Sequence, residues 1–166
     1  MAASPFRPAI DLLAQYAEYH RDRRNIATHF VGIPAIVLAI MVLLARPLGG
    51  ALSWLAVLFA AQFYLRLDLR WGVVMSALFA LAAWLGVTIA VHAYWFGPVL
   101  FVGGWALQFL GHVYEGKKPA FLDDLRGLLI GPLFVVVELL FALGLLRTLQ
   151  QELRSREDAL TVDALV

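Results

Sequence analysis

The chain has 166 residues, of which 62% are hydrophobic and 15% are charged, and its formal net charge at pH 7 is +1. Soluble domains carry roughly 25% charged residues, so polar side chains are too few to coat a water-soluble globule, and a bilayer must solvate much of the surface. The near-neutral charge excludes an electrostatic nucleic-acid surface, and the absence of cysteine excludes disulfides, thiolate metal sites and cysteine nucleophiles.

The first 25 residues do not resemble a secretory signal peptide, because they contain no long apolar core. Apolar side chains recur at helical spacing in this segment and form one stripe, whereas most acidic and polar side chains lie off it. The stripe consists of Ile10, Leu12, Leu13, Ala14, Tyr16 and Ala17. The pattern predicts an amphipathic helix at the membrane interface, followed by a basic turn.

Five apolar segments follow, and these are the candidate membrane helices. They cover residues 26–45, 48–65, 71–96, 98–111 and 127–146. Because a spanning helix needs roughly 20 residues, segment 98–111 is short for a full crossing and would be tilted or partly buried. We expect an all-α integral membrane bundle of about five membrane helices in three parts: the interfacial helix and turn (1–25), a membrane domain (26–146) and a charged tail (147–166).

Basic residues in the short loops predict the orientation, because Lys and Arg are enriched on the cytoplasmic side. With a cytoplasmic N-terminus, nine basic residues lie inside and four outside. Three of the four outer ones belong to the tail, which this orientation places on the opposite side from the N-terminus. These three would lie inside if one of the five helices failed to cross. The composition is compatible with a bacterial inner membrane, or with the endoplasmic reticulum in a eukaryote.

This orientation sorts the four histidines by depth. His20 lies at the cytoplasmic interface, His29 lies one turn inside the first membrane helix, and His112 lies at the cytoplasmic end of the fourth. His92 follows Trp71 by 21 residues on the third membrane helix, a rise of roughly 31 Å that brings it near the opposite face. Three histidines are expected to converge, and His92 is not.

The stretch YHRDRRNIATHF raises the question of whether His20 and His29 act together. A spacing of nine residues places two side chains on opposite faces of one helix, so these two can share a site only if the chain bends between them. The charged RDRRN run is the candidate bend, with Asn25 as the candidate N-cap of the next helix. The alternative is a solvated His20 at the interface and a His29 that is hydrogen-bonded within the bundle.

A second group of polar residues closes the fourth membrane helix. Gln108, His112 and Glu115 are spaced by four and then three residues, so they share one helical face. Imidazole and carboxylate without sulfur suit non-heme Fe(II), Zn or Mn, and a His with a carboxylate three residues away resembles the inward-facing pairs of di-iron bundles in reversed order. The alternative is an interfacial His and a solvated Glu beside the two lysines that follow.

One ionisable side chain lies deep in the last apolar segment. Glu138 is about 11 residues, or 17 Å, into this segment, where a charge is costly and marks a functional candidate. It could orient a ligating histidine, or bind a proton or a cation. The alternative is a protonated Glu that is paired for structural reasons.

Three stretches of the sequence together form a spaced pattern. YHRDRRNIATHFVGIP is followed by GGWALQFLGHVYEGKKPAFLDDL and then by GPLFVVVE. The positions that carry the pattern are Tyr19, His20, Asn25, His29, Pro34, Trp105, Gln108, Phe109, Gly111, His112, Glu115, Pro119, Ala120, Pro132 and Glu138. The pattern resembles the Mpo1-like family, with one departure: two residues separate His112 from Glu115 here, where family members usually have three.

The resemblance implies an Fe(II)-dependent dioxygenase. Such an enzyme takes a 2-hydroxy fatty acid and dioxygen through α-oxidation to a fatty acid one carbon shorter, with membrane lipid around the acyl chain. A 2-hydroxy carboxylate can chelate a metal through two oxygens, which holds the reacting carbons beside it. In this interpretation the metal ligands and catalytic residues are His20, His29 and His112, with Glu115 as a candidate fourth ligand, and the supporting residues are Asn25, Gln108 and Glu138.

Two other classes of function stay open. A small transporter or channel would use Glu138 and Gln62 as a polar pathway, although the sequence contains no inverted repeat. A metal-free lipid-binding membrane module would need no ligand set at all. No nucleic acid is expected as a partner under any of the three.

Overall fold

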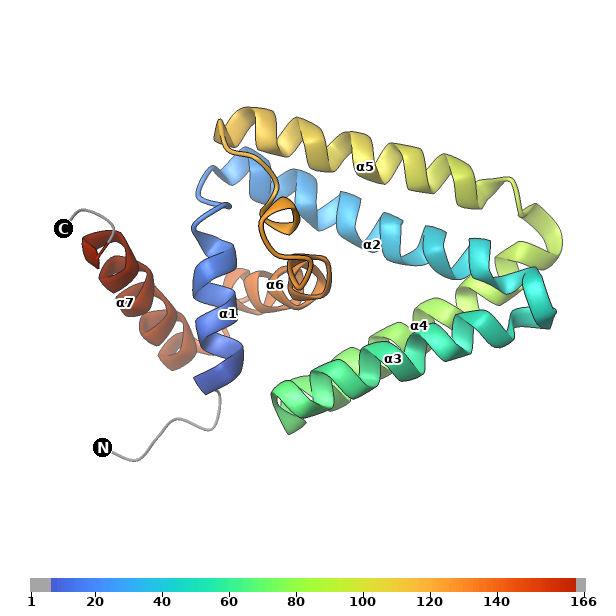
Figure 1. Ribbon diagram of the computed structural model, residues 1–166, viewed down its shortest axis with the longest axis horizontal. Coiled ribbons are helices and arrows are strands. Elements are labelled where there is room, and N and C mark those ends of the chain that lie inside the picture. Colours follow the sequence, from blue (N-terminus) through green and yellow to red (C-terminus); the bar gives the residue numbers. More distant parts are fainter. Residues whose placement is uncertain (1–6, 164–166) are drawn as a thin grey trace.

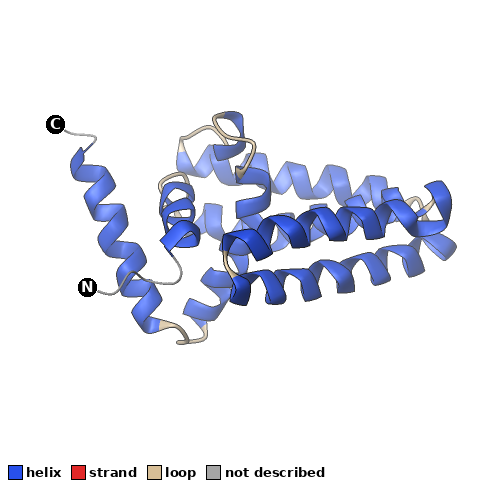
Figure 2. Ribbon diagram, turned by 60° about the horizontal axis from the view of Figure 1, so that its bottom comes forward, coloured by secondary structure: helices blue, strands red, loops and turns tan. Residues whose placement is uncertain are grey.

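The structure, a computed structural model, describes residues 7–163, and within them every regular element is a helix (Figure 1; Figure 2). In chain order these are α1 (Arg7–Ala17), α2 (Arg23–Ala45), the 3-10 helix η1 (Pro47–Gly50), α3 (Ala51–Leu67), α4 (Leu69–Ala93), α5 (Phe96–Glu115), the 3-10 helix η2 (Ala120–Leu122), α6 (Gly127–Ala142) and α7 (Arg147–Asp163). The expected all-α fold is confirmed.

The long helices form two antiparallel pairs, α2 with α5 and α3 with α4, which meet at one end of the molecule and diverge toward the other (Figure 1). Glycine permits close approach within each pair. A Cβ on Gly104 of α5 would come within 3.0 Å of the Gly32 carbonyl oxygen on α2, and a Cβ on Gly72 of α4 would lie 2.6 Å from the Cα of Leu65 on α3. Because no side chain fits at these distances, the backbones of each pair are in direct contact.

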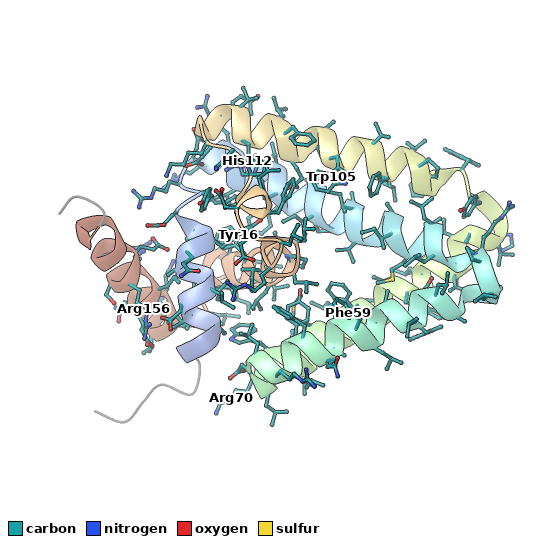
Figure 3. The ribbon with its side chains drawn as sticks, in the orientation of Figure 1. Tyr16, Phe59, Arg70, Trp105, His112 and Arg156 are labelled. Atoms are coloured by element: carbon teal, nitrogen blue, oxygen red, sulfur yellow. The ribbon has the colours of Figure 1, made fainter. Side chains whose placement is uncertain are left out.

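Among the described residues, four helical stretches are long and apolar enough to cross a membrane: α2, η1 with α3, α4, and α5. The helix expected over 98–111 is longer than predicted, with 20 residues in α5, because Gly97 and Pro98 lie inside its first turn instead of ending the preceding helix. Outward-facing apolar side chains such as Phe59 (Figure 3) cover α3 and α4, as expected for a surface solvated by lipid.

The last apolar segment is shorter than predicted. α6 has 16 residues and ends at Ala142, before Gly144 adopts a φ of +75° and redirects the chain. This helix is foreshortened in Figure 1, whereas α2, α3, α4 and α5 lie close to the plane of the view, so α6 is inclined to the two pairs. It contacts α1 and α2, and therefore fills the space that the diverging pairs leave.

The two terminal helices pack against each other. α1 buries the predicted apolar stripe, and α7 buries Leu149 and Leu153 in the same cluster. Arg156 of α7 pairs with Asp11 of α1 (Figure 3). The expectation that the tail lies opposite the N-terminus is therefore wrong, because α7 carries an apolar stripe that a count of loop charges does not register and because α6 is short.

The chain bends between α1 and α2 over residues 18–22. The predicted bend is thus present, but only Arg21 and Asp22 of the charged run 21–25 belong to it, because the helix already begins at Arg23. The N-cap of α2 is Asp22, however, and not Asn25, which lies inside the first turn of the helix. The Asp22 carboxylate accepts a hydrogen bond from the Arg24 backbone N–H at 2.7 Å, and the hydrogen bonds from Arg24 lower the pKa of Asp22 to about 2. A charged acceptor at this position also compensates the positive end of the helix dipole.

Candidate metal centre

Three histidines from separate parts of the chain meet where the helix pairs diverge. His20 comes from the turn between α1 and α2, His29 from α2, and His112 from the last turn of α5 (Figure 3). One ring nitrogen of each lies within 4.8 Å of one ring nitrogen of both others, and all three side chains are buried. Their rings are inclined to one another by 68° to 82°, so they meet by their edges instead of stacking.

Hydrogen bonds fix the protonation of two of these rings. His20 Nδ1 lies 2.7 Å from the Tyr16 carbonyl oxygen and His29 Nδ1 lies 2.9 Å from the Asn25 carbonyl oxygen. A carbonyl can only accept, so both Nδ1 atoms carry the proton and donate it. In a neutral imidazole the Nε2 atom then carries a lone pair and no hydrogen. Both rings therefore present an Nε2 lone pair.

These two lone pairs face the same space, because His20 Nε2 and His29 Nε2 are 3.0 Å apart. Burial, with the neighbouring His29 as a further cause, lowers the pKa of His20 to about 3, so near neutral pH this ring does not take up the second proton that would bridge the pair. Two nitrogens that each bind one ion at about 2.1 Å lie roughly 3.0 Å apart when they subtend a right angle. The donor set therefore fits a metal cation.

His112 contributes the third nitrogen. Its Nδ1 is buried and has no hydrogen-bond partner among the described residues, and a buried polar atom without a partner is costly. Its helix can approach α2 because residue 111 is glycine. A Cβ on Gly111 would lie 2.2 Å from Thr28 Oγ1 and 2.4 Å from Asn25 Oδ1. The same ring has a nitrogen within 4.8 Å of a ring nitrogen of His20 and of one of His29, so the three imidazoles together fit one cation.

Glu115 and Asn25 join the turn that carries His20 to both helices. The Glu115 carboxylate accepts hydrogen bonds from the backbone N–H of Arg21 at 3.0 Å, from that of Asp22 at 2.8 Å and from Asn25 Nδ2 at 3.1 Å. Asn25 is 0% exposed, and its Nδ2 also donates to the Tyr19 carbonyl oxygen at 3.2 Å. The structure thus places Glu115 outside the three-histidine group and directs its oxygens to amide donors instead of toward the ring nitrogens.

An apolar cavity of about 330 Å³ adjoins the cluster. His29, His112 and Gln108 supply polar groups at one end, and Trp105 (Figure 3) lines the wall on α5. Gln108 is 6% exposed, and its Nε2 has no hydrogen-bond partner among the described residues. The remaining lining comes from Tyr16 of α1 and from apolar residues of α2, α4, α5, η2 and α6. A metal bound at the cluster would therefore lie at the head of an apolar chamber.

Three polar residues that the sequence singled out do not line this cavity. His92 is exposed in the last turn of α4 and lies outside the group of three histidines, as predicted. Glu138 lies on α6, and the charged groups that act on it are Glu157 and Arg154 of α7. Gln62, the weaker member of the predicted polar pathway, is exposed on α3.

One side chain at the site escaped the sequence analysis. The Tyr16 ring stacks on the His20 ring, with centroids 4.1 Å apart and planes at 9°, and it also lines the cavity (Figure 3). Burial raises the pKa of its hydroxyl, so the phenol keeps its proton. The spacing of four residues between Tyr16 and His20 is the sequence signal for this contact, whereas the apolar periodicity places Tyr16 only in the apolar stripe.

Comparison with known proteins identifies the protein family to which the chain belongs. A family model described as "Mpo1-like: 2-hydroxy-palmitic acid dioxygenase Mpo1-like" matches residues 6–143. The chain is 31% identical over 153 residues to the 2-hydroxy-palmitic acid dioxygenase MPO1 of Saccharomyces cerevisiae, a match that covers 87% of this chain and 88% of the yeast protein. No solved structure matches the chain. The resemblance drawn from the spaced histidine pattern is thereby confirmed, and the chain belongs to the Mpo1-like family.

Proposed function

We propose that this protein is an Fe(II)-dependent dioxygenase of 2-hydroxy fatty acids, which it shortens by one carbon. The observation that carries the proposal is the pair of Nε2 lone pairs 3.0 Å apart, with a ring nitrogen of His112 within 4.8 Å of a ring nitrogen of each of the other two histidines. The similarity to a yeast enzyme named for 2-hydroxy-palmitic acid supports the substrate class. His20, His29 and His112 are the proposed ligands, and the iron they hold would bind and activate dioxygen and the chelating head of the substrate.

The electrostatics of the site favour an anionic head group. Three neutral imidazoles leave the charge of a divalent ion uncompensated, so a carboxylate from the substrate is attracted to the same place. The Gln108 Nε2 donor at the head of the cavity is suited to receive a substrate oxygen, which would relieve the cost of an unmade hydrogen bond. The acyl chain then lies in the apolar part of the cavity, where water is excluded.

Glu115 and Asn25 act as positioning residues in this proposal. Asn25 holds the His29 ring through its own carbonyl oxygen and is tied to Glu115 through its side chain. Glu115 in turn holds the turn that carries His20. Such outer hydrogen bonds set the direction of ligand lone pairs. We also propose that the cluster end faces the cytoplasm, because with the tail on that side twelve of the thirteen basic residues lie at the same end and Arg46 at the other.

The overall conversion balances without a separate reductant. One 2-hydroxy acid and one dioxygen give the shortened carboxylic acid, carbon dioxide and water. The bond between the carboxyl carbon and the hydroxyl-bearing carbon breaks, both carbons are oxidised, and dioxygen is reduced. The polar pathway required by a transporter has no support here, since neither Glu138 nor Gln62 lines the cavity.

Metal content and oxygen uptake of the purified protein test the proposal. Protein loaded with Fe(II) without air should retain about one iron per chain by elemental analysis. On addition of 2-hydroxypalmitate and air it should consume one dioxygen for each shortened acid formed. Retention of no divalent metal, or iron retention with no oxygen uptake for any 2-hydroxy acid, would contradict it. Flux of small solutes through proteoliposomes without metal would instead favour the transporter.

A further inference from the structure

The cavity beside the three histidines is elongated and has different chemistry at its two ends. The inference that we draw from it rests on the proposed function. Its wall on α2 is a single helical stripe that runs from His29 through Ile33 and Val37 to Met41. Met41 follows His29 by twelve residues, a rise of roughly 18 Å. On α5 the stripe runs the opposite way, from His112 to Phe101. The cavity therefore extends along the α2–α5 pair, with the cluster at one end.

Polarity is confined to the cluster end. Gln108 is one turn from His112, and a Cβ on Gly32 would lie 2.3 Å from its Nε2, so this amide sits over α2 close to the level of Ile33. Beyond it, the lining side chains toward Met41 are aliphatic or aromatic. A molecule that fits has a polar head and a long unbranched apolar tail.

Two buried side chains, Met41 of α2 and Phe79 of α4, line the far end, and they are 2% and 9% exposed. The backbone at Met41 is fixed from two directions. Ser53 donates a hydrogen bond to its carbonyl oxygen at 2.9 Å, and a Cβ on Gly86 of α4 would lie 2.6 Å from the Met41 Cβ. Because α2 cannot shift here, the depth of the cavity depends on the volume of these side chains.

We infer that Met41 and Phe79 form the end wall of the acyl site and set the longest acyl chain that the enzyme accepts. The head group binds at the histidines and the tail reaches toward this wall. A tail that is too long meets Met41 and Phe79, whereas a shorter one leaves apolar surface uncovered. Each methylene that cannot be buried costs about 0.8 kcal/mol, or roughly a fourfold loss of binding.

Two opposed variants test the wall. Phe79→Ala deepens the cavity and should move the preferred chain length upward. Val37→Phe fills its middle and should move the preference downward, with at least about a tenfold change in the ratio of kcat/KM for long and short 2-hydroxy acids, since two lost methylenes already cost roughly fifteenfold. Leu81→Ala and Val31→Phe are matched controls, because both side chains are exposed on the same two helices, and neither should alter the ratio.

A binding measurement separates this inference from the proposed function. The affinities of unhydroxylated, unreactive fatty acids of graded length are measured by calorimetry for the wild type and the variants in nanodiscs. Shifts of the preferred chain length in opposite directions in the two variants support the end wall. They do so even if no 2-hydroxy acid is turned over, a result that would contradict the enzymatic proposal but not the end wall. An unchanged length profile in both variants overturns the wall even if turnover is intact. Should Phe79→Ala fail to fold, Met41→Ala and Phe79→Leu probe the same end.

Discussion

The two helix pairs are built alike but carry different contents. In both, glycine brings the backbones into contact. Each pair also has one helix whose N-terminus is capped by an aspartate: Asp22 caps α2 and Asp68 caps α4. Among the described residues of the two pairs, buried imidazole and amide side chains lie on α2 and α5, His29, His112 and Asn25 among them, whereas the buried polar residue of the other pair is Ser53. The α3–α4 pair presents apolar side chains outward and supplies Phe79 to the cavity. Close packing alone therefore does not make a site; the buried polar network on one pair does.

Removal of a proposed ligand from the α2–α5 pair should have the largest effect on iron retention and turnover. His29→Ala or His112→Ala should reduce iron retention and turnover by more than the roughly 100-fold that loss of an outer hydrogen bond can cost. His92→Ala is the matched control on the α3–α4 pair, and it should behave as the wild type. Iron content by elemental analysis and oxygen uptake are the measurements. Full iron occupancy in both ligand variants would refute the assignment.

Alanine variants of one contact glycine in each pair should distinguish a loss of iron affinity from a loss of stability. Gly111→Ala places a Cβ against Thr28 and Asn25, whereas Gly72→Ala places one against Leu65. Overpacking of this kind costs about 1–3 kcal/mol, so both variants should unfold at lower temperature. Only Gly111→Ala should also weaken iron affinity, by about tenfold or more, because it pushes α5 from the cluster.

Gly103→Ala is the control for these two variants, since a Cβ there meets nothing within 4 Å. The readouts are thermal unfolding in detergent and a competitive iron chelation titration. Equal losses of iron affinity in Gly111→Ala and Gly72→Ala would mean that the metal effect is only a consequence of general destabilisation.

Glu115→Gln tests the positioning role of this carboxylate. The variant keeps the size of the side chain but loses the charge that strengthens the hydrogen bonds from Arg21 and Asp22. Iron affinity should fall by about tenfold, within the range known for outer partners of ligands, while the iron signal in electron paramagnetic resonance of the nitrosyl adduct keeps a three-nitrogen ligand set. A spectrum that loses an oxygen ligand would instead restore Glu115 as a fourth ligand.

Glu138→Gln is the matched comparison for Glu115→Gln. Because Glu138 lies against α7 and not at the cavity, iron affinity should be unchanged. A fall in iron affinity equal to that of Glu115→Gln would show that Glu138 supports the ligands, as the sequence pattern predicts.

The helix caps give the smallest expected effect. Asp22→Ala and Asp68→Ala each remove side-chain acceptors for backbone N–H groups, and each should cost about 1 kcal/mol of stability. Only Asp22→Ala should also lower iron affinity, by a few-fold, because the cap is two residues from His20. Chemical unfolding and chelation titrations run side by side would detect the difference, and identical iron affinities would mean that the turn is held by Glu115 alone.

Local patterns predicted a large part of this molecule. The apolar stripe of α1, the four long membrane helices and the bend before His29 follow from periodicity, length and charge, which each short stretch of chain expresses by itself. The separation of His92 from the other three histidines followed as well, because helical rise is fixed. The N-cap was misplaced by three residues, since Asp22 and Asn25 are equally acceptable caps in sequence and only their hydrogen bonds distinguish them.

Other features depend on contacts between distant segments, and the patterns did not reach them. The two oxygens of Glu115 find donors more than 90 residues away, and helical spacing toward His112 gave no hint of those donors. α7 lies on α1 because two apolar stripes at opposite ends of the chain cover each other. The sequence by itself determined a helical membrane protein with three histidines at one end. Only the tertiary structure decided that two of them turn lone pairs toward one point at the head of an apolar cavity, because that depends on which distant carbonyls and amides the packing brings within hydrogen-bond distance.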